Sequence, residues 1–153
     1  MKAAANPVIV DPPPPPMPDD AVIELRRTTC YGTCPAYHVA LSASGEVRWT
    51  GKSYVKREGE RTWTVDPRAV EPLWQALDAL SWQRLPRETA TVDCPELWSD
   101  HPSFELVVRG GGETRAVSHY LGCRGNPDYE ALVPLSEQVD VVAQTAAAVG
   151  ARR

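Results

Sequence analysis

Short connections join most of the apolar segments of this chain, and their length decides which kind of sheet the chain can form. Residues 37–43 alternate between apolar and small or polar side chains, which is typical of a half-buried strand, and Ser44-Gly45 marks a turn before the next segment, 46–51. Parallel strands need a crossover of about a dozen residues or more, which connections this short cannot supply. The sequence therefore predicts a mostly antiparallel sheet.

Similar patterns predict the remaining strands. A first strand is expected over 21–28, and a second hairpin, with arms at 54–57 and 61–65, around Glu58-Gly59-Glu60. The charged residues at the tip of that hairpin would form a solvated turn. Alternation over 104–109, a triple-glycine turn at 110–112 and a returning segment at 113–120 predict one more hairpin.

Two helices are expected, each opened by a capping residue followed by proline. Asp66-Pro67 and Asn126-Pro127 both place an N-cap side chain before a proline at the first helical position. Apolar side chains then recur at helical spacing: Val70, Leu73, Trp74, Leu77 and Leu80 in the first segment, and Leu132, Leu135, Val139 and Val142 in the second. Pro72 would separate the first turn or mark the true helix start, Pro134 would divide the last helix, and Gly150 would cap its end.

The predicted order of elements is β-β-β-β-α-β-β-α, an α+β domain in which two helices cover one face of a mostly antiparallel sheet of about six strands. The chain has 153 residues, which suits one ordinary domain. Seven of its fifteen prolines fall within the first eighteen residues, where the run 12–16 favours an extended polyproline II rod. We therefore expect a Pro-rich disordered lead or tether over 1–20 and a single domain over 21–153.

Charge and the absence of known motifs argue against several classes of function. The formal net charge of −4 argues against a nucleic-acid binder with a basic surface. The sequence has no apolar run of about 18 residues, the length that a membrane-spanning helix needs. It has no phosphate-binding, nucleophile-elbow or zinc-protease motif, and no spacing forces His101 or His119 next to a nucleophile. We therefore assign no catalytic residue and expect no cofactor.

The four cysteines, Cys30, Cys34, Cys94 and Cys123, allow three pairings. We favour Cys30 with Cys34, which could bridge a tight turn, and Cys94 with Cys123, which flank a predicted hairpin. An even number of cysteines placed at loop ends suggests an oxidising compartment. The alternative is four reduced thiols in a cytosolic protein.

A metal or redox role is the main alternative for the Cys30-x3-Cys34-Pro35 motif. Its two thiols and His38 are three soft ligands within nine residues, and the spacing resembles the copper-binding loop of Sco-type copper chaperones. In that family the loop leads into a helix of a thioredoxin fold, whereas the segment after Pro35 alternates as a strand. Copper or zinc binding by Cys30, Cys34 and His38, or thiol exchange, thus stays as the alternative to a structural disulfide.

Aromatic residues near a long loop would make a binding surface. Segment 81–103 is long and irregular and contains three prolines, and loops of that length are often functional. Exposed Trp and Tyr are enriched at the energetically important positions of interfaces. The candidate binding face combines this loop with its expected neighbours: Tyr31, Tyr54, Trp98, His101, His119 and Tyr120. The alternative is that most of the aromatic side chains belong to the core.

The chain resembles a bacterial family known only as a domain of unknown function, with the signature R-T-x-C-x-G-x-C-P-x-Y. The resemblance lies in Arg27-Thr28, in the segment from Cys30 to Tyr37 and in the hairpin after it. Weaker matches at Val92-Asp93 and at 118–120 extend the resemblance over about 21–145. Members are often exported proteins or lipoproteins. The resemblance therefore implies a periplasmic or outer-membrane-associated location and allows a lipid anchor in the full-length precursor. It implies no activity and no catalytic residues.

These observations lead to one expectation about function. We expect a small, disulfide-stapled envelope domain that binds another envelope protein or an envelope component and carries out no catalysis itself. We expect neither a nucleic-acid partner nor a transmembrane segment. The alternative is the metal or thiol-redox protein described above.

Overall fold

Six strands form one antiparallel sheet in the computed structural model, which describes residues 12–85, 87 and 94–150. The strands are β1 (Val22–Arg27), β2 (Ala36–Ser42), β3 (Glu46–Ser53), β4 (Gly59–Thr64), β6 (Ser103–Gly110) and β7 (Glu113–Tyr120). Their spatial order is β4-β3-β2-β1-β6-β7, so β1 lies inside the sheet between β2 and β6. Two further short strands, β5 (Glu96–Leu97) and β8 (Cys123–Arg124), pair as a small second sheet.

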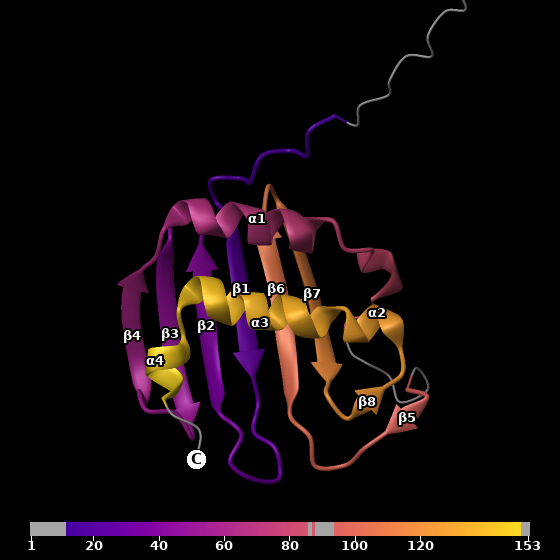
Figure 1. The fold of residues 1–153 in the computed structure, drawn as a ribbon. Coiled ribbons are helices and arrows are strands. Elements are labelled where there is room, and N and C mark those ends of the chain that lie inside the picture. The colour runs from indigo at the N-terminus through magenta and orange to yellow at the C-terminus, as the bar shows by residue number, and fades with distance from the viewer. Residues whose placement is uncertain (1–11, 86, 88–93, 151–153) are drawn as a thin grey trace, which may run out of the picture.

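Two main helices, α1 (Pro67–Asp78) and α3 (Leu132–Ala143), cross the same face of the large sheet (Figure 1). Shorter helical turns accompany them: η1 (Trp82–Arg84), α2 (Pro127–Glu130) and α4 (Ala146–Val149). This arrangement confirms the predicted α+β class, the antiparallel sheet of six strands and the two helices packed against it. In the described part of the chain, no helix is long and apolar enough to cross a membrane.

The core lies between the sheet and these two helices. Alternate strand residues point into it, among them Ile23, Leu25, Val39, Leu41, Phe104 and Leu106, and each of these is at most 1% exposed. The predicted helical stripes meet them, with Val70, Leu73, Trp74, Leu77, Leu132 and Val139 buried. Burial of such apolar area supplies the main driving force for folding.

The predicted strand at 54–57 is wrong, because its backbone donors bond to a helix instead of a strand. The amides of Lys56 and Arg57 donate to the carbonyls of Val149 and Ala148 in α4, each at 2.9 Å. β3 therefore runs on to Ser53 and pairs directly with β4. The chain returns close to β3, where a Cβ on Gly51 would lie 2.0 Å from the Arg57 carbonyl oxygen.

The helix starts are confirmed, whereas the effects predicted for two prolines are corrected. The side chains of Asp66 and Asn126 both accept a backbone hydrogen bond as N-caps. α1 runs through Pro72 without a break, because the buried apolar stripe continues on both sides of it. The last helical region breaks at Ala131, and Pro134 lies in the first turn of α3, where a missing N–H costs no helical bond.

The described part of the Pro-rich lead contacts the domain. The carbonyl of Pro15 accepts a 2.8 Å hydrogen bond from Gln75 Nε2 on α1, and Met17 packs against the core. Asp20 accepts a hydrogen bond from the Gly111 amide at 3.1 Å. Residues 12–20 thus run along the end of the sheet near α1, while residues 1–11 of the predicted tether lie outside the described residues (Figure 1).

Candidate binding pocket at the loop end of the sheet

Several loops gather at the end of the sheet away from α1 (Figure 1). Residues at this end line a pocket of about 610 Å³, here called the loop-end pocket. One wall comes from the end of β1 and the loop that leads to β2: Arg27, Thr28, Thr33, Cys34 and Pro35. The other walls come from the ends of β3, β6, β7 and α4: Tyr54, Pro102, Ser103, Leu121, Val149 and Gly150. The pocket therefore collects segments that are far apart in the sequence.

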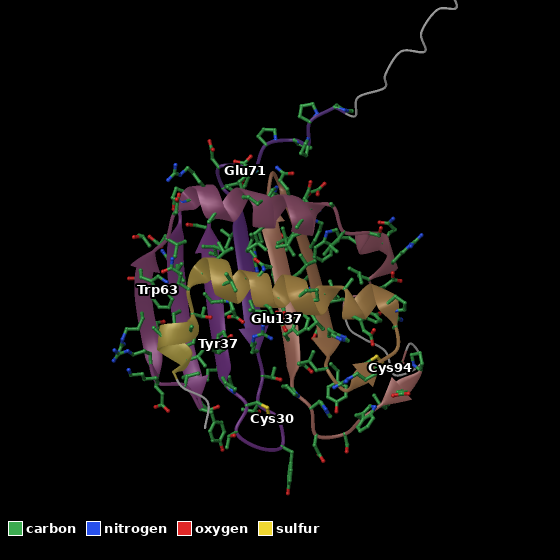
Figure 2. All side chains as sticks on the ribbon, viewed as in Figure 1. Cys30, Tyr37, Trp63, Glu71, Cys94 and Glu137 are labelled. Atoms are coloured by element: carbon green, nitrogen blue, oxygen red, sulfur yellow. A yellow bond between two sulfur atoms is a disulfide. The ribbon has the colours of Figure 1, made fainter. Side chains whose placement is uncertain are left out.

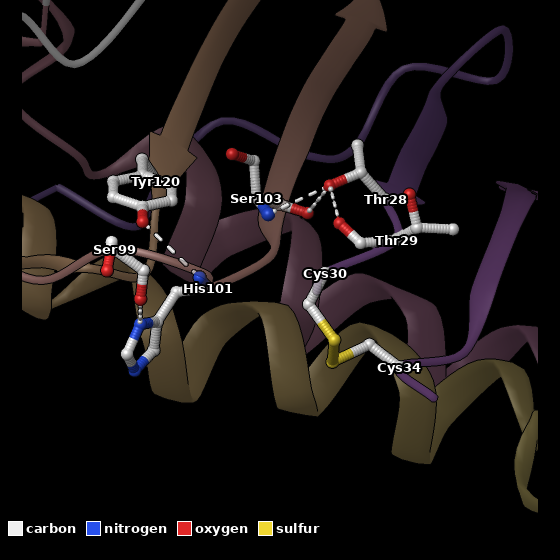
Figure 3. The surroundings of a disulfide bond; sticks show 8 residues. All are labelled: Thr28, Thr29, Cys30, Cys34, Ser99, His101, Ser103 and Tyr120. Atoms are coloured by element: carbon white, nitrogen blue, oxygen red, sulfur yellow. Dashed lines mark hydrogen bonds between the residues drawn. A yellow bond between two sulfur atoms is a disulfide. The ribbon is translucent and has the colours of Figure 1, made fainter. Parts of the chain in front are cut away.

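A disulfide holds the loop that forms the first wall. Cys30 and Cys34 are bonded, with their Cα atoms 5.6 Å apart, as the spacing predicted. Thr28 fastens the start of this loop to β6, since its hydroxyl accepts from the Ser103 amide at 2.9 Å and donates to the Ser103 carbonyl at 3.2 Å (Figure 3). The loop is thereby tied at both ends.

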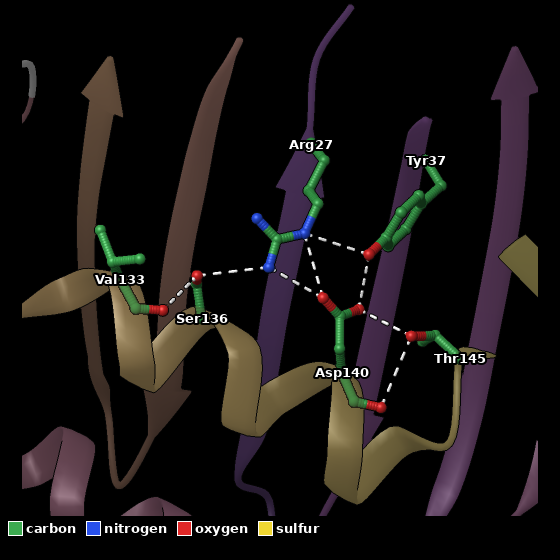
Figure 4. Close-up of polar contacts among 6 residues, drawn as sticks. All are labelled: Arg27, Tyr37, Val133, Ser136, Asp140 and Thr145. Carbon is green, nitrogen blue, oxygen red and sulfur yellow. Dashed lines mark hydrogen bonds and ion pairs between the residues drawn. The ribbon is translucent and has the colours of Figure 1, made fainter. Parts of the chain in front are cut away.

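Beneath the pocket, Arg27 is held by a polar cluster between the sheet and α3 (Figure 4). Its Nε and Nη2 donate to Asp140 Oδ2 at 3.0 and 2.8 Å, and Nη2 also donates to Ser136 Oγ at 3.2 Å. The guanidinium lies over the Phe104 ring, 5.7 Å from its centroid. Burial alone would lower the pKa of Arg27, but the charge of Asp140 and the Tyr37 hydroxyl outweigh it and raise that pKa. Arg27 is thus a fixed cation.

Tyr37 and Thr145 complete the cluster on the other side of Asp140. Both hydroxyls donate to Asp140 Oδ1, Tyr37 at 2.6 Å and Thr145 at 2.7 Å. Burial and the neighbouring carboxylate raise the pKa of Tyr37, so this phenol stays a donor. The Tyr37 ring stacks on Trp49 with centroids 4.6 Å apart. The carboxylate of Asp140 therefore accepts four hydrogen bonds from three side chains that come from β1, β2 and the start of α4.

Several donors at the pocket remain unused in the described part of the chain. The second terminal nitrogen of Arg27, Nη1, makes no hydrogen bond there and points away from Asp140 (Figure 4). The hydroxyls of Thr33 and Ser103 also make no hydrogen bond in this part of the chain. Among the described residues that line the pocket, none is acidic. This arrangement offers hydrogen-bond donors to a ligand and no carboxylate to repel an anion.

Tyr54 marks one end of the pocket and has an unusual backbone. Its side chain is 56% exposed. Its backbone φ is 54°, in the left-handed region that residues other than glycine rarely adopt. Such a conformation persists only where the surrounding structure imposes it, here the hydrogen bonds from residues 56 and 57 to α4. Tyr31, on the disulfide loop, is 87% exposed. Two of the predicted face residues thus lie on or beside the pocket.

Trp98, His101 and Tyr120 form a second group, and Figure 3 shows His101 and Tyr120 beside Ser103 of the pocket. The Tyr120 hydroxyl donates to the Trp98 carbonyl and accepts from the His101 amide, and the His101 and Tyr120 rings meet edge to face. The Leu121 amide, just after Tyr120, bonds to the Pro102 carbonyl, which joins this group to the pocket wall. Trp98 is 55% exposed.

The remaining member of the predicted face, His119, lies inside the molecule. It is 1% exposed, and its ring stacks on Tyr129 and meets Phe104 edge to face. Burial lowers its pKa, against a smaller opposing effect of Glu130. His119 therefore packs between the sheet and α2 and has no surface to offer a partner.

The second disulfide joins Cys94 to Cys123, again as predicted. It fastens the end of the long loop beside the short sheet of β5 and β8 (Figure 2). Two disulfides indicate that the domain folds outside the reducing cytoplasm. The Val92-Asp93 step and most of the 86–93 segment lie outside the described residues.

The three residues of the metal alternative do not converge. The sulfurs of Cys30 and Cys34 are bonded to each other, and His38 lies on the face of the sheet that the helices leave open. There His38 Nε2 lies 3.1 Å from Glu24 Oε1, and that hydrogen bond, with Arg109, lowers the pKa of Glu24. In the described parts of the chain, no group of three or more His, Cys, Asp or Glu residues could hold a metal ion.

The polar cluster around Asp140 was not foreseen from the sequence. Local signals for it do exist: Arg27 and Tyr37 are register partners on β1 and β2, on either side of the disulfide loop. Ser136 and Asp140 are four residues apart in α3, so they share one face of the helix. What the sequence lacks is any sign that this helix face lies over Arg27.

The comparison with known families identifies the family of this chain. A family model described as "Domain of unknown function (DUF6438)" matches residues 21–140, and the chain belongs to this family. The matched segment begins just before β1 and ends at Asp140, so it contains Arg27, Tyr37, Ser136 and Asp140. No curated protein matches the chain.

Proposed function

We propose that this member of the family is a non-enzymatic binding domain of the bacterial envelope, and that it contacts its partner at the loop-end pocket. The observation that carries the proposal is the pocket itself: a concave site with unused donors, walled by a disulfide loop and marked at one end by an exposed, conformationally strained tyrosine. Strained residues of this kind concentrate at functional sites.

The chemistry of the lining favours binding over catalysis. The described lining offers a guanidinium, hydroxyl groups and apolar walls from Pro35, Pro102, Leu121 and Val149. A general base would need to lie within hydrogen-bond reach of a reacting proton. His101 precedes the lining residue Pro102 in the chain, and its Nδ1 lies 2.7 Å from the Ser99 carbonyl oxygen. The groups present at the pocket suit recognition.

The partner is proposed to be another envelope protein or an envelope component, in the periplasm or at the outer membrane. The two disulfides support an oxidising compartment. The exposed Tyr31 and Tyr54 beside the pocket, and Trp98 in the neighbouring group, have the side-chain types that dominate the energy of protein interfaces.

A site-specific photo-crosslink in the bacterial envelope tests this proposal. A photoreactive side chain replaces Tyr54 in one variant, and replaces Thr62 on the open sheet face in a matched control. We expect a defined crosslinked species from position 54 that is absent from position 62 and that disappears when Thr33 is also changed to Trp, which would fill the pocket. Equal crosslinking from both positions, or none from position 54, would overturn the proposal.

A further inference from the structure

We propose that the loop-end pocket binds an extended peptide segment and recognises a carboxylate on it. This inference rests on the proposed function and specifies the chemistry of the partner at the same site. It follows from three features of the pocket: its length along the sheet end, its unused donors and the support beneath Arg27.

The pocket follows the ends of neighbouring strands. Its residues include Tyr54 after β3, Pro35 before β2, Arg27 at the end of β1, Ser103 at the start of β6, and Leu121 after β7. These five strands are adjacent in the sheet. With about 4.8 Å between strands, four steps span about 19 Å, which is the length of five or six residues of extended chain. A short peptide fits this shape.

The unused donors lie near the middle of this line. Arg27 has the two N–H groups of Nη1 without a hydrogen bond among the described residues, and the pocket is also lined by Thr33 and Ser103, which carry hydroxyls. A carboxylate accepts several hydrogen bonds at once, and bonds from a guanidinium to a carboxylate are among the strongest in proteins. The chain carries 20 acidic residues, yet none of the described lining residues is acidic. The lining therefore favours a ligand with a negative charge over one with a positive charge.

The polar cluster holds Arg27 ready to bind. Nε and Nη2 are occupied by Asp140, Tyr37 and Ser136, which leaves only the Nη1 edge for a ligand. The negative charge of Asp140 balances the charge of Arg27. The same carboxylate also accepts hydrogen bonds from the Tyr37 and Thr145 hydroxyls. A ligand thus meets an oriented donor pair with its rotamer already fixed, and ordering Arg27 adds no cost on binding.

The apolar walls define the rest of the segment. The pocket is lined by the apolar residues Pro35, Pro102, Leu121 and Val149, and by Tyr54. They suit small or aliphatic side chains. The carboxylate of the ligand has two sources, the C-terminus of a peptide or the side chain of Asp or Glu. The same donors can form hydrogen bonds with either.

Three capped peptides of one length separate these sources. The probes are acetyl-Ala-Val-Ala-Pro-Ala with a free C-terminus, the same peptide as its C-terminal amide, and the amide with Glu in the last position. Binding is followed by two-dimensional NMR of the nitrogen-labelled domain, including the arginine side-chain region. We expect the free acid or the Glu peptide to shift the signals of Arg27, Thr33 and Ser103, and the plain amide to bind about tenfold more weakly.

Single hydroxyl deletions tie the binding to the pocket. Thr33→Ala and Ser103→Ala remove donors that support no other described contact, so the fold should persist, whereas Thr62→Ala on the open sheet face is the matched control. We expect each pocket variant to weaken the carboxylate peptide about three- to tenfold and the control to leave it unchanged. Arg27→Lys, checked for folding by circular dichroism, should abolish the difference between acid and amide.

The outcomes distinguish this inference from the proposed function. Equal binding of the three peptides, shifts confined to the open sheet face, or no shifts up to about 5 mM peptide would overturn carboxylate recognition. If crosslinking from position 54 persisted in that case, the pocket would still be a partner site of other chemistry. Carboxylate binding without any crosslink in the envelope would support this inference and overturn the proposed function.

Discussion

Replacing Asp140 with Ala should destabilise the domain by about 3 kcal/mol, because the change leaves the Arg27 charge without its partner. Removing one member of a buried ion pair costs about 3–5 kcal/mol. Here the side chains of Arg27 and Asp140 are 18% and 22% exposed, so water compensates part of that loss. The hydroxyls of Tyr37 and Thr145 also lose their acceptor, at about 1 kcal/mol each if they find no other. The lower end of the range, about 3 kcal/mol, is therefore expected.

Urea unfolding of matched variants measures this loss directly. Glu137→Ala is the control, since Glu137 is an exposed residue of the same helix, and it should change the free energy of unfolding by less than about 0.5 kcal/mol. Tyr37→Phe keeps the ring stack on Trp49 and should cost about 1–2 kcal/mol. A cost below about 1 kcal/mol for Asp140→Ala, or additive effects in the double variant with Tyr37→Phe, would refute the reasoning.

Four further predictions concern single features of the fold and the site. Burial lowers the pKa of His119 below its ordinary 6.5, so the unfolded chain binds more protons than the folded one. The free energy of unfolding in urea should therefore fall as the pH drops from about 7 towards the lowered pKa. His119→Phe should remove this pH dependence. Replacing both cysteines of the 94–123 disulfide by Ser should cost about 3–4 kcal/mol of unfolding free energy, against about 2 kcal/mol for the 30–34 disulfide. Tyr54→Gly should stabilise the domain by about 1 kcal/mol in urea, and unchanged stability would argue against strain at this residue. Trp98→Ala should weaken capture of the crosslinked partner and leave the thermal unfolding midpoint within about 2 °C, and unchanged capture would exclude the second aromatic group from the interface.

The sequence could predict the elements whose causes are local. The N-caps at Asp66 and Asn126 are set by a side chain and a proline that are neighbours in the chain, and both were confirmed. The disulfide pairing also follows from short-range geometry: four residues for one pair and the ends of a hairpin region for the other. Alternation predicted the single strands, and connections too short for a parallel crossover were enough to predict the antiparallel sheet.

The errors arise where tertiary contacts decide. Residues 56 and 57 would pair as a strand by pattern, but α4, some 90 residues later, takes their backbone donors. Pro72 weakens a helix locally, but the burial of Trp74 and its neighbours keeps α1 intact. His119 was grouped with exposed aromatics because the sequence could not show that α2 covers it with Tyr129. Each outcome depends on which element packs on which, and no short window contains that information.

Arg27 belongs both to the polar cluster that joins the sheet to α3 and to the wall of the pocket, and this double role limits what its substitution can show. A variant at Arg27 loses stability and any ligand contact together, so a loss of binding there has two explanations. Thr33 and Ser103 line the same pocket, and their hydroxyls take no part in the cluster in the described structure. A binding defect in these two variants, with unchanged unfolding in urea, would therefore assign the pocket a role that the stability of the fold does not require.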